Sequence, residues 1–243
     1  EDVTSPYKLE FTEAEKQALF EYSANSNSFQ INIGVRTNTN AGWSSKLGTA
    51  YITNANPIFN NFTYEDTNIK TKSLTGNNQI IIKNYSDLRA TISLSNKAIA
   101  QKGATMSNYQ LVVGAKQVTM PYSATEPVIM NVEKVDNNVF TVYAIDSREN
   151  STLKQISPIN YINYFKPVFA NAYAERTDDI GDETTLFLEG SFFNENFGSV
   201  ANDITLSYKY KKTDEDDSKW QNGVTPIVPI KNGNNYSFEG KIA

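Results

Sequence analysis

The amino-acid sequence predicts an all-β protein made of tandem β-sandwich modules, with one short helix near the N-terminus. Three observations lead to this prediction. Strand-forming residues are plentiful, with 14 Tyr and 13 Phe among 243 residues. Short segments of alternating apolar and polar residues are separated by turn signals at regular intervals. The stretch at residues 56–68 returns at residues 166–178, which indicates a duplicated unit.

The repeated stretch follows the pattern P-[IV]-F-x-N-x-x-x-E-x-T-[ND], and its prolines, Pro57 and Pro167, are 110 residues apart. Periods of 20 to 50 residues mark solenoids and propellers, whereas a spacing near 110 is the size of one domain. We therefore expect the C-terminal part of a module at 1–56, a complete module at 57–166, and the N-terminal part of a further module at 167–243. The chain is then a window cut from a longer array.

Residues 8–22 carry the clearest helix signal in the first stretch. Thr12 with Glu15 three positions later forms a capping box, which satisfies free amides at a helix start. We expect apolar residues to seat this helix on a sheet, namely Leu9, Phe11, Leu19 and Phe20. Residues 29–35 then alternate as a half-buried strand. Residues 37–45 form a polar hairpin loop, and 47–52 form the returning strand.

The second stretch reads as about seven short strands, typical of an immunoglobulin or fibronectin-III sandwich. The absence of a Cys…Trp…Cys pattern excludes an antibody-type domain. Residues 96–103 are expected to hold a helical turn at 98–100. The expected strands begin with a first strand carrying Phe59, Phe62 and Tyr64, and continue with 71–75, 80–82, 90–94, 109–113, 128–132, 140–144 and a return over 156–164.

The third stretch begins with the second copy of the repeated motif, at Pro167. Strands are expected around Leu186 and Leu188 and, by alternation, over residues 203–210. An acidic loop at 214–217 precedes Trp220. A turn at 231–235 then leads into a strand that carries Tyr236 and Phe238.

Composition excludes several kinds of chemistry. The chain has no Cys and no His, so it lacks disulfides, thiolate nucleophiles and the commonest general base. Its net charge is −5, and no segment has the basic excess that nucleic-acid binding needs. No apolar run of 18 residues exists, so no membrane insertion is expected. No signal peptide is recognisable.

Two groups of carboxylates are candidate sites. Asp178, Asp179, Asp182 and Glu183 lie within six residues, and hard cations such as Ca²⁺ take several such oxygens. The alternative is a solvated loop, because no EF-hand pattern is present. We expect no cofactor.

Glu65 and Glu175 recur at the repeat position, which favours a shared structural task over a glycosidase pair. We expect no enzymatic activity.

Aromatic residues are the other candidates. Trp43 and Trp220 are expected in polar loops, where a flat apolar ring contacts either a sugar or a partner protein. Tyr161, Tyr164 and Phe165 lie at the second repeat junction. For both sets the alternative interpretation is ordinary packing.

A family resemblance rests on turn and packing residues. The segments 74–78, 96–98 with 102–104, and 181–186, together with Trp220-x-x-Gly223, resemble minor tail structural proteins of siphophages and prophages of Gram-positive bacteria. That resemblance implies tandem β-sandwiches in a tail tip or baseplate. It also implies a virion protein that is assembled in the host cytoplasm, associates with other tail proteins and forms a homo-oligomer.

The leading hypothesis is therefore a non-enzymatic spacer and assembly protein of a phage tail, with a role in host attachment through cell-wall glycan. Two alternatives remain open. One is a Gram-positive cell-surface adhesin. The other is a set of non-catalytic carbohydrate-binding modules of a wall hydrolase, in which Trp43 and Trp220 would contact the glycan.

Overall fold

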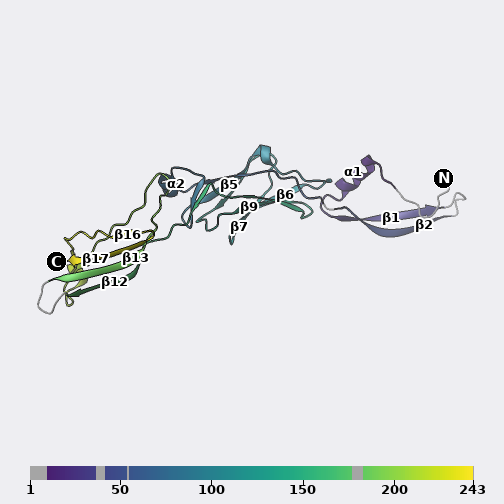
Figure 1. Cartoon of the computed structure of the whole chain (residues 1–243). Coiled ribbons are helices and arrows are strands. Elements are labelled where there is room, and N and C mark those ends of the chain that lie inside the picture. Colours follow the sequence, from purple (N-terminus) through teal and green to yellow (C-terminus); the bar gives the residue numbers. More distant parts are fainter. Residues whose placement is uncertain (1–9, 37–41, 54, 177–182, 243) are drawn as a thin grey trace. The chain divides into compact units, whose positions relative to one another are not determined.

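A computed structural model describes residues 10–36, 42–53, 55–176 and 183–242 (Figure 1). Strands contain 47% of the residues and helices contain 10%. This confirms the prediction of an all-β chain. Contacts divide the chain into two units. The first comprises Glu1–Asn68 and Asn84–Asn160, and the second comprises Ile69–Lys83 and Tyr161–Ala243.

The first unit opens with helix α1 (Glu13–Tyr22), and the predicted capping box is confirmed. Thr12 Oγ1 accepts a hydrogen bond from the Glu15 amide, and the Glu15 carboxylate accepts one from the Thr12 amide. None of the helix residues is fully buried, and Leu19 and Phe20 are half-buried. The expected apolar seat on a sheet stays a prediction, and Leu9 lies outside the described residues. No helix in the described part of the chain is long and apolar enough to cross a membrane.

Strands β1 (Ser28–Arg36) and β2 (Trp43–Tyr51) form an antiparallel hairpin of nine residue pairs, from Ser28↔Tyr51 to Arg36↔Trp43 (Figure 1). The predicted hairpin is confirmed. Its predicted half-burial is wrong, because the apolar side chains of the hairpin are largely exposed. Trp43 opens β2 rather than lying within a loop.

Two antiparallel sheets form the rest of the first unit. One has the order β3 (Thr63–Asp66), β5 (Leu88–Ile92), β8 (Val128–Val132); the other has the order β10 (Ser151–Ile156), β9 (Phe140–Asp146), β6 (Met106–Val113), β7 (Lys116–Pro121). Tyr64 of the first sheet packs edge-on against Phe140 of the second, with ring centroids 5.2 Å apart. Side chains of both sheets supply fully buried core positions, including Leu88, Ile92, Leu111 and Val142.

Several expected elements in this stretch differ from the structure. Residues 71–75 belong to helix α2 (Ile69–Thr75), not to a strand. The helical turn lies at Leu94–Asn96, not at 98–100. The strand returning from β9 is Ser151–Ile156, while Asn160–Ile162 forms β11 in another sheet. Phe59 and Phe62 are buried but lie outside β3. Strand β7 was not predicted.

The second unit has two centres of packing. Near α2, strand β4 (Ile80–Ile82) pairs with β11, and a core forms from Ile82, Ile162, Phe193 and Phe197. Further on, one sheet has the order β12 (Val168–Arg176), β13 (Thr184–Ser191), β17 (Asn235–Ile242), β16 (Ile230–Asn232) (Figure 1). Leu186 and Leu188 of β13 pack against Leu206, Tyr208 and Ile227.

Only part of the expected strand at 203–210 forms. The structure has a short strand, β14 (Lys209–Tyr210), paired with β15 (Gln221–Asn222), and an isolated bridge between Leu206 and Ile227. The turn expected at 231–235 does join two strands, β16 and β17.

The two copies of the repeated motif lie in different surroundings. Phe59 of the first copy is 2% exposed, whereas its counterpart Phe169 is 61% exposed on β12. A duplicated unit predicts equivalent surroundings for equivalent residues, and this prediction is wrong for this pair. The boundaries at 57 and 167 stay a prediction, and the contacts group residues 69–83 with the C-terminal part of the chain.

Candidate functional site

A buried arginine joins the N-terminal helix to the two-sheet part of the first unit. Arg148 lies in the loop between β9 and β10 and is 7% exposed. Its Nε donates to the carbonyl oxygen of Ser23, and its Nη2 donates to that of Phe20, both at 2.9 Å. Since a guanidinium presents several donors in a rigid fork, it can hold two carbonyls of one helix end together.

The loop that carries Arg148 is held by a buried carboxylate. Asp146 is 1% exposed. Its Oδ1 accepts from the amides of Arg148 and Asn150, both at 2.9 Å, and its Oδ2 accepts from the side-chain amide of Asn150 at 3.1 Å. A buried carboxylate with several amide donors is satisfied. Asp146 therefore fixes the backbone around Arg148, and the Arg148 side chain extends from this fixed loop to α1.

The other side of the joint is the C-terminal end of α1. The last turn of this helix contains no basic residue, although cations near a helix C-terminus bond its free carbonyls and stabilise its dipole. Arg148, 125 residues after Ser23, supplies that positive charge. Ser147 Oγ donates to the Ala24 carbonyl, and Lys102 Nζ donates to the Thr53 carbonyl at 2.9 Å.

Close backbone approach makes the joint tight. Gly103 has a φ of +72°, and a Cβ built there would lie 2.6 Å from the carbonyl carbon of Phe20. Only glycine combines this left-handed conformation with such a contact. We call the set Lys102, Gly103, Ser147 and Arg148, with the helix end at Phe20–Ala24, the α1 joint.

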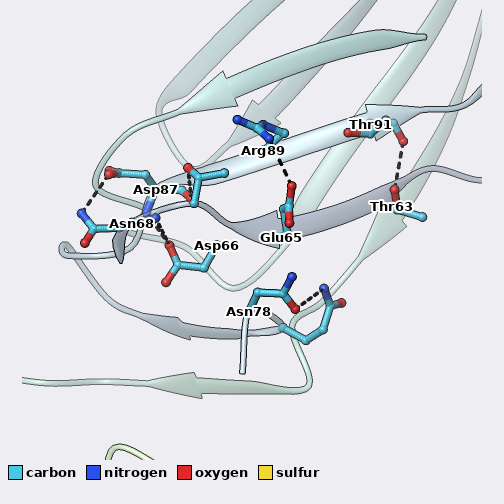
Figure 2. A network of polar contacts seen from close by, with 10 residues as sticks. Thr63, Glu65, Asp66, Asn68, Asn78, Asp87, Arg89 and Thr91 are labelled. Atoms are coloured by element: carbon cyan, nitrogen blue, oxygen red, sulfur yellow. Dashed lines mark hydrogen bonds and ion pairs between the residues drawn. The ribbon is translucent and has the colours of Figure 1, made fainter. Parts of the chain in front are cut away.

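A second polar network fixes the end of β3 (Figure 2). Asp66, fully buried, accepts hydrogen bonds from Ser86 Oγ at 2.8 Å and from the amides of Asn68 and Asp87 at 3.0 and 3.1 Å. Asp87 in turn accepts from the Asn68 side chain and from the Lys134 amide. These bonds join the chain that leaves β3 to the chain that enters β5, so the carboxylates here have a structural role.

Among the described residues, no three His, Cys, Asp or Glu side chains are grouped so that they could hold a metal ion. The acidic site expected at residues 178–183 stays a prediction. Asp178, Asp179 and Asp182 lie outside the described part of the chain, and Glu183 pairs with Lys241. Glu65 pairs with Arg89 at 3.3 Å across β3 and β5. Glu175 lies opposite Thr185 on β12 and β13.

Both tryptophans lie at the surface with a cation over the ring. Trp43 is 68% exposed, with the Arg36 guanidinium 4.9 Å from the ring centroid; Trp220 is 49% exposed, with Lys211 Nζ at 5.4 Å. Such contacts stabilise an exposed ring modestly. The junction aromatics behave differently, since Tyr164 and Phe165 both pack edge-on against Phe193.

The second unit also contains an open cavity of about 420 Å³ at one end of its larger sheet, lined by Ala174, Thr184, Leu186, Tyr208, Lys209, Tyr210 and Ile242. Its size is within the range of small-molecule pockets. The Tyr208 hydroxyl is buried and has no hydrogen-bond partner among the residues that the structure describes. The Tyr208 ring packs directly against Gly223, and a Cβ at Gly223 would clash with the Cζ atom of Tyr208.

The sequence reasoning did not single out Arg148, Asp66 or Asp146. One local signal was available: Asp146 and Asn150 flank a short loop between alternating segments, and Asx residues there hydrogen-bond their own backbone. No local signal connects Arg148 with a helix 125 residues earlier. No protein-family model matches this chain, and no curated protein matches it significantly.

Proposed function

We propose that this chain is a structural, non-enzymatic component of a phage tail tip or baseplate. In this proposal, β-sandwich modules of immunoglobulin or fibronectin-III type act as spacers and assembly surfaces, in the virion, after assembly in the host cytoplasm. Its partners are other tail proteins, further molecules of the same chain and host cell-wall glycan.

The α1 joint is the observation that carries this proposal. A spacer transmits position only if successive segments cannot pivot freely, and relative motion is the default where an interface is small. Here a buried guanidinium, a serine hydroxyl and a lysine all bond to backbone carbonyls of residues 20–53. Hydrogen bonds from charged groups contribute about 1.5 to 3 kcal/mol each, so the joint is held by directional bonds rather than by apolar area.

Electron microscopy of phage particles tests this proposal. Particles are labelled with an antibody raised against residues 57–166, and label at the tail tip is expected. Label confined to bacterial cell walls, with tails unlabelled, overturns the tail assignment and favours the adhesin.

Glycan binding is the second candidate, and the exposure of Trp43 and Trp220 favours it. An exposed indole offers flat apolar area for stacking on a sugar ring. Binding of purified wall glycan is expected to weaken in Trp43→Ala or in Trp220→Ala, with Tyr22→Ala as an exposed aromatic control. Unchanged binding in both variants, or no binding by the wild type, removes this candidate.

A further inference from the structure

The β1–β2 hairpin presents an apolar face. The register pairs Ile33 with Lys46 and Val35 with Ser44, and directly opposed residues share a face of a sheet. Phe29, Ile31, Ile33 and Val35 therefore line one face, with Lys46 among them. Ile33 is 58% exposed and Val35 is 66% exposed. We call this the hairpin face.

An equivalent hairpin in the same unit shows how such a face is normally covered. Strand β9 also alternates apolar and polar residues, pairs with β10, and is followed by a short polar loop. It is buried because β6 pairs along its other edge and because Tyr64 packs on Phe140 from the facing sheet. The β1–β2 hairpin forms a sheet of only two strands, and isolated hairpins are marginal in water. A second sheet is the natural cover for the hairpin face.

The larger sheet of the second unit has a face of complementary character. One side of this sheet carries Leu186 and Leu188 and is covered by Leu206, Tyr208 and Ile227. The register places Tyr173, Phe187 and Glu239 together on the opposite side, with Glu189 beside Ser237 and Ile230. Tyr173 stacks on Phe187 with centroids 4.8 Å apart, and Ile230 is 72% exposed. A hollow of about 270 Å³ lies among these residues.

The charges of the two faces are opposite. Lys46 lies on the hairpin face, whereas Arg36 lies on the other side of the hairpin with Trp43. Strands β1 and β2 contain no acidic residue. The exposed side of the β12–β13–β17–β16 sheet, which we call the acidic face, carries Glu175, Glu189 and Glu239. Of the described strand residues on this face, Lys241 is the basic one, and it is already paired with Glu183. Complementary charges of this kind fix partner choice and register.

We propose that the hairpin face of one molecule packs on the acidic face of a second molecule of the same chain. Two sheets then pack face to face, with Ile33 and Val35 against Tyr173, Phe187 and Ile230, and Lys46 among the glutamates. The contact joins unlike surfaces, so it is head-to-tail and each molecule offers one of each. This contact rests on the proposed function in one respect, because it specifies how the copies of the chain named there as partners associate. It is tested on the purified chain, so its failure is distinct from a failure of the tail assignment.

Sedimentation velocity over a range of concentrations tests the contact. The wild-type chain is expected to associate with increasing concentration and to dissociate as salt screens the charges. Lys46→Glu and Glu189→Lys are each expected to weaken association about tenfold or more, because each places like charges together. Lys154→Glu and Glu195→Lys, which are exposed and lie on neither face, are the matched controls and should associate as the wild type does.

Mixing the two charge-reversed variants is the decisive measurement. The hairpin face of Lys46→Glu then meets the acidic face of Glu189→Lys, and their charges are again opposite. The hairpin face of Glu189→Lys and the acidic face of Lys46→Glu are both native, so association should return. A wild-type chain that stays monomeric at every concentration overturns the proposal. This holds even if another part of the same molecule covers the hairpin face. Charge-reversed variants that associate normally, or a mixture that stays dissociated, also overturn it.

Discussion

Arg148 donates a hydrogen bond from Nε to the carbonyl oxygen of Ser23, and in doing so it closes the C-terminal end of a helix 125 residues away in sequence. The helix has no basic residue of its own in its last turn and no buried residue. Local sequence starts this helix at Thr12, but a distant loop determines where its other end is held.

Arg148→Ala is therefore expected to release α1 from the first unit. Two hydrogen bonds from a charged donor are lost, which together contribute about 3 kcal/mol or more. Amide hydrogen exchange should show much faster exchange at Lys16 and Ser23, whose amides bond within this helix. The midpoint of global unfolding should change less, because the helix detaches locally.

Arg148→Lys serves as the control for charge. Lysine keeps the positive charge but lacks the planar fork, so it cannot reproduce both bonds. Partial protection of α1 is expected. Exchange rates in Arg148→Ala equal to those of the wild type would contradict a joint held by this residue.

Gly103→Ala is expected to disturb the same joint from the other side. The new Cβ would lie 2.6 Å from the Phe20 carbonyl carbon, and the residue has a φ of +72°. The chain must move at the helix end, since the neighbouring atom is backbone, and hydrogen exchange in α1 should rise.

Gly233→Ala is the matched control for strain without a clash. Its φ is +56°, and a Cβ there would have no atom within 4 Å. A left-handed alanine costs about 1 to 2 kcal/mol, so the second unit should be slightly less stable while α1 keeps its protection. Equal protection of α1 in both variants would show that the contact at Gly103 is unimportant.

Asp66→Ala is expected to destabilise the first unit by about 3 kcal/mol or more. The substitution removes the carboxylate that accepts hydrogen bonds from the buried Ser86 hydroxyl and from the half-buried amides of Asn68 and Asp87. Urea unfolding measures the loss. Glu65→Ala, one residue earlier, removes a solvent-accessible pair with Arg89, and the loss of such a pair should cost less than about 1 kcal/mol. Similar midpoints for the two variants would contradict the structural role of Asp66.

Sequence patterns predicted the features that depend on neighbouring residues. The capping box of Thr12 and Glu15, the hairpin that begins near Phe29, and strands such as β6, β8 and β9 were predicted because capping and alternation act over a few residues. Helix α2 was mistaken for a strand: it is only seven residues long and turns its Thr71 and Thr75 inward, so apolar periodicity gave no helix signal.

Features set by distant contacts were missed. Alternation predicted half-burial of β1 wrongly, whereas most residues of β9, which alternates in the same way, are buried. The difference arises because burial depends on a second sheet that the strand itself does not encode. The same reason explains Phe59 and Phe169, which share a motif and differ in exposure. Asp66, Asp146 and Arg148 look like ordinary surface residues in sequence, because their partners come from other elements or from the loop conformation.

Tyr109→Phe is expected to change how stability depends on pH. Burial raises the pKa of the Tyr109 hydroxyl above its ordinary value of 10.0, and the hydrogen bond that it accepts from the Ala98 amide only partly offsets this. The folded state therefore retains a proton that the unfolded state loses above pH 10.0. The free energy of unfolding of the wild type should be insensitive to this residue below that pH and should fall as the pH rises beyond it. Tyr64, whose pKa burial also raises, acts in the same direction.

At neutral pH, Tyr109→Phe should be less stable than the wild type by about 1 kcal/mol or more, because the buried Ala98 amide loses its acceptor. The variant has no hydroxyl to ionise, so the difference should narrow as the pH rises above 10.0. Urea midpoints at several pH values measure both effects. Tyr22→Phe, at a side chain that is 81% exposed, should match the wild type at neutral pH. A difference between Tyr109→Phe and the wild type that widens in alkaline solution would show that burial does not hold the Tyr109 hydroxyl in its neutral form.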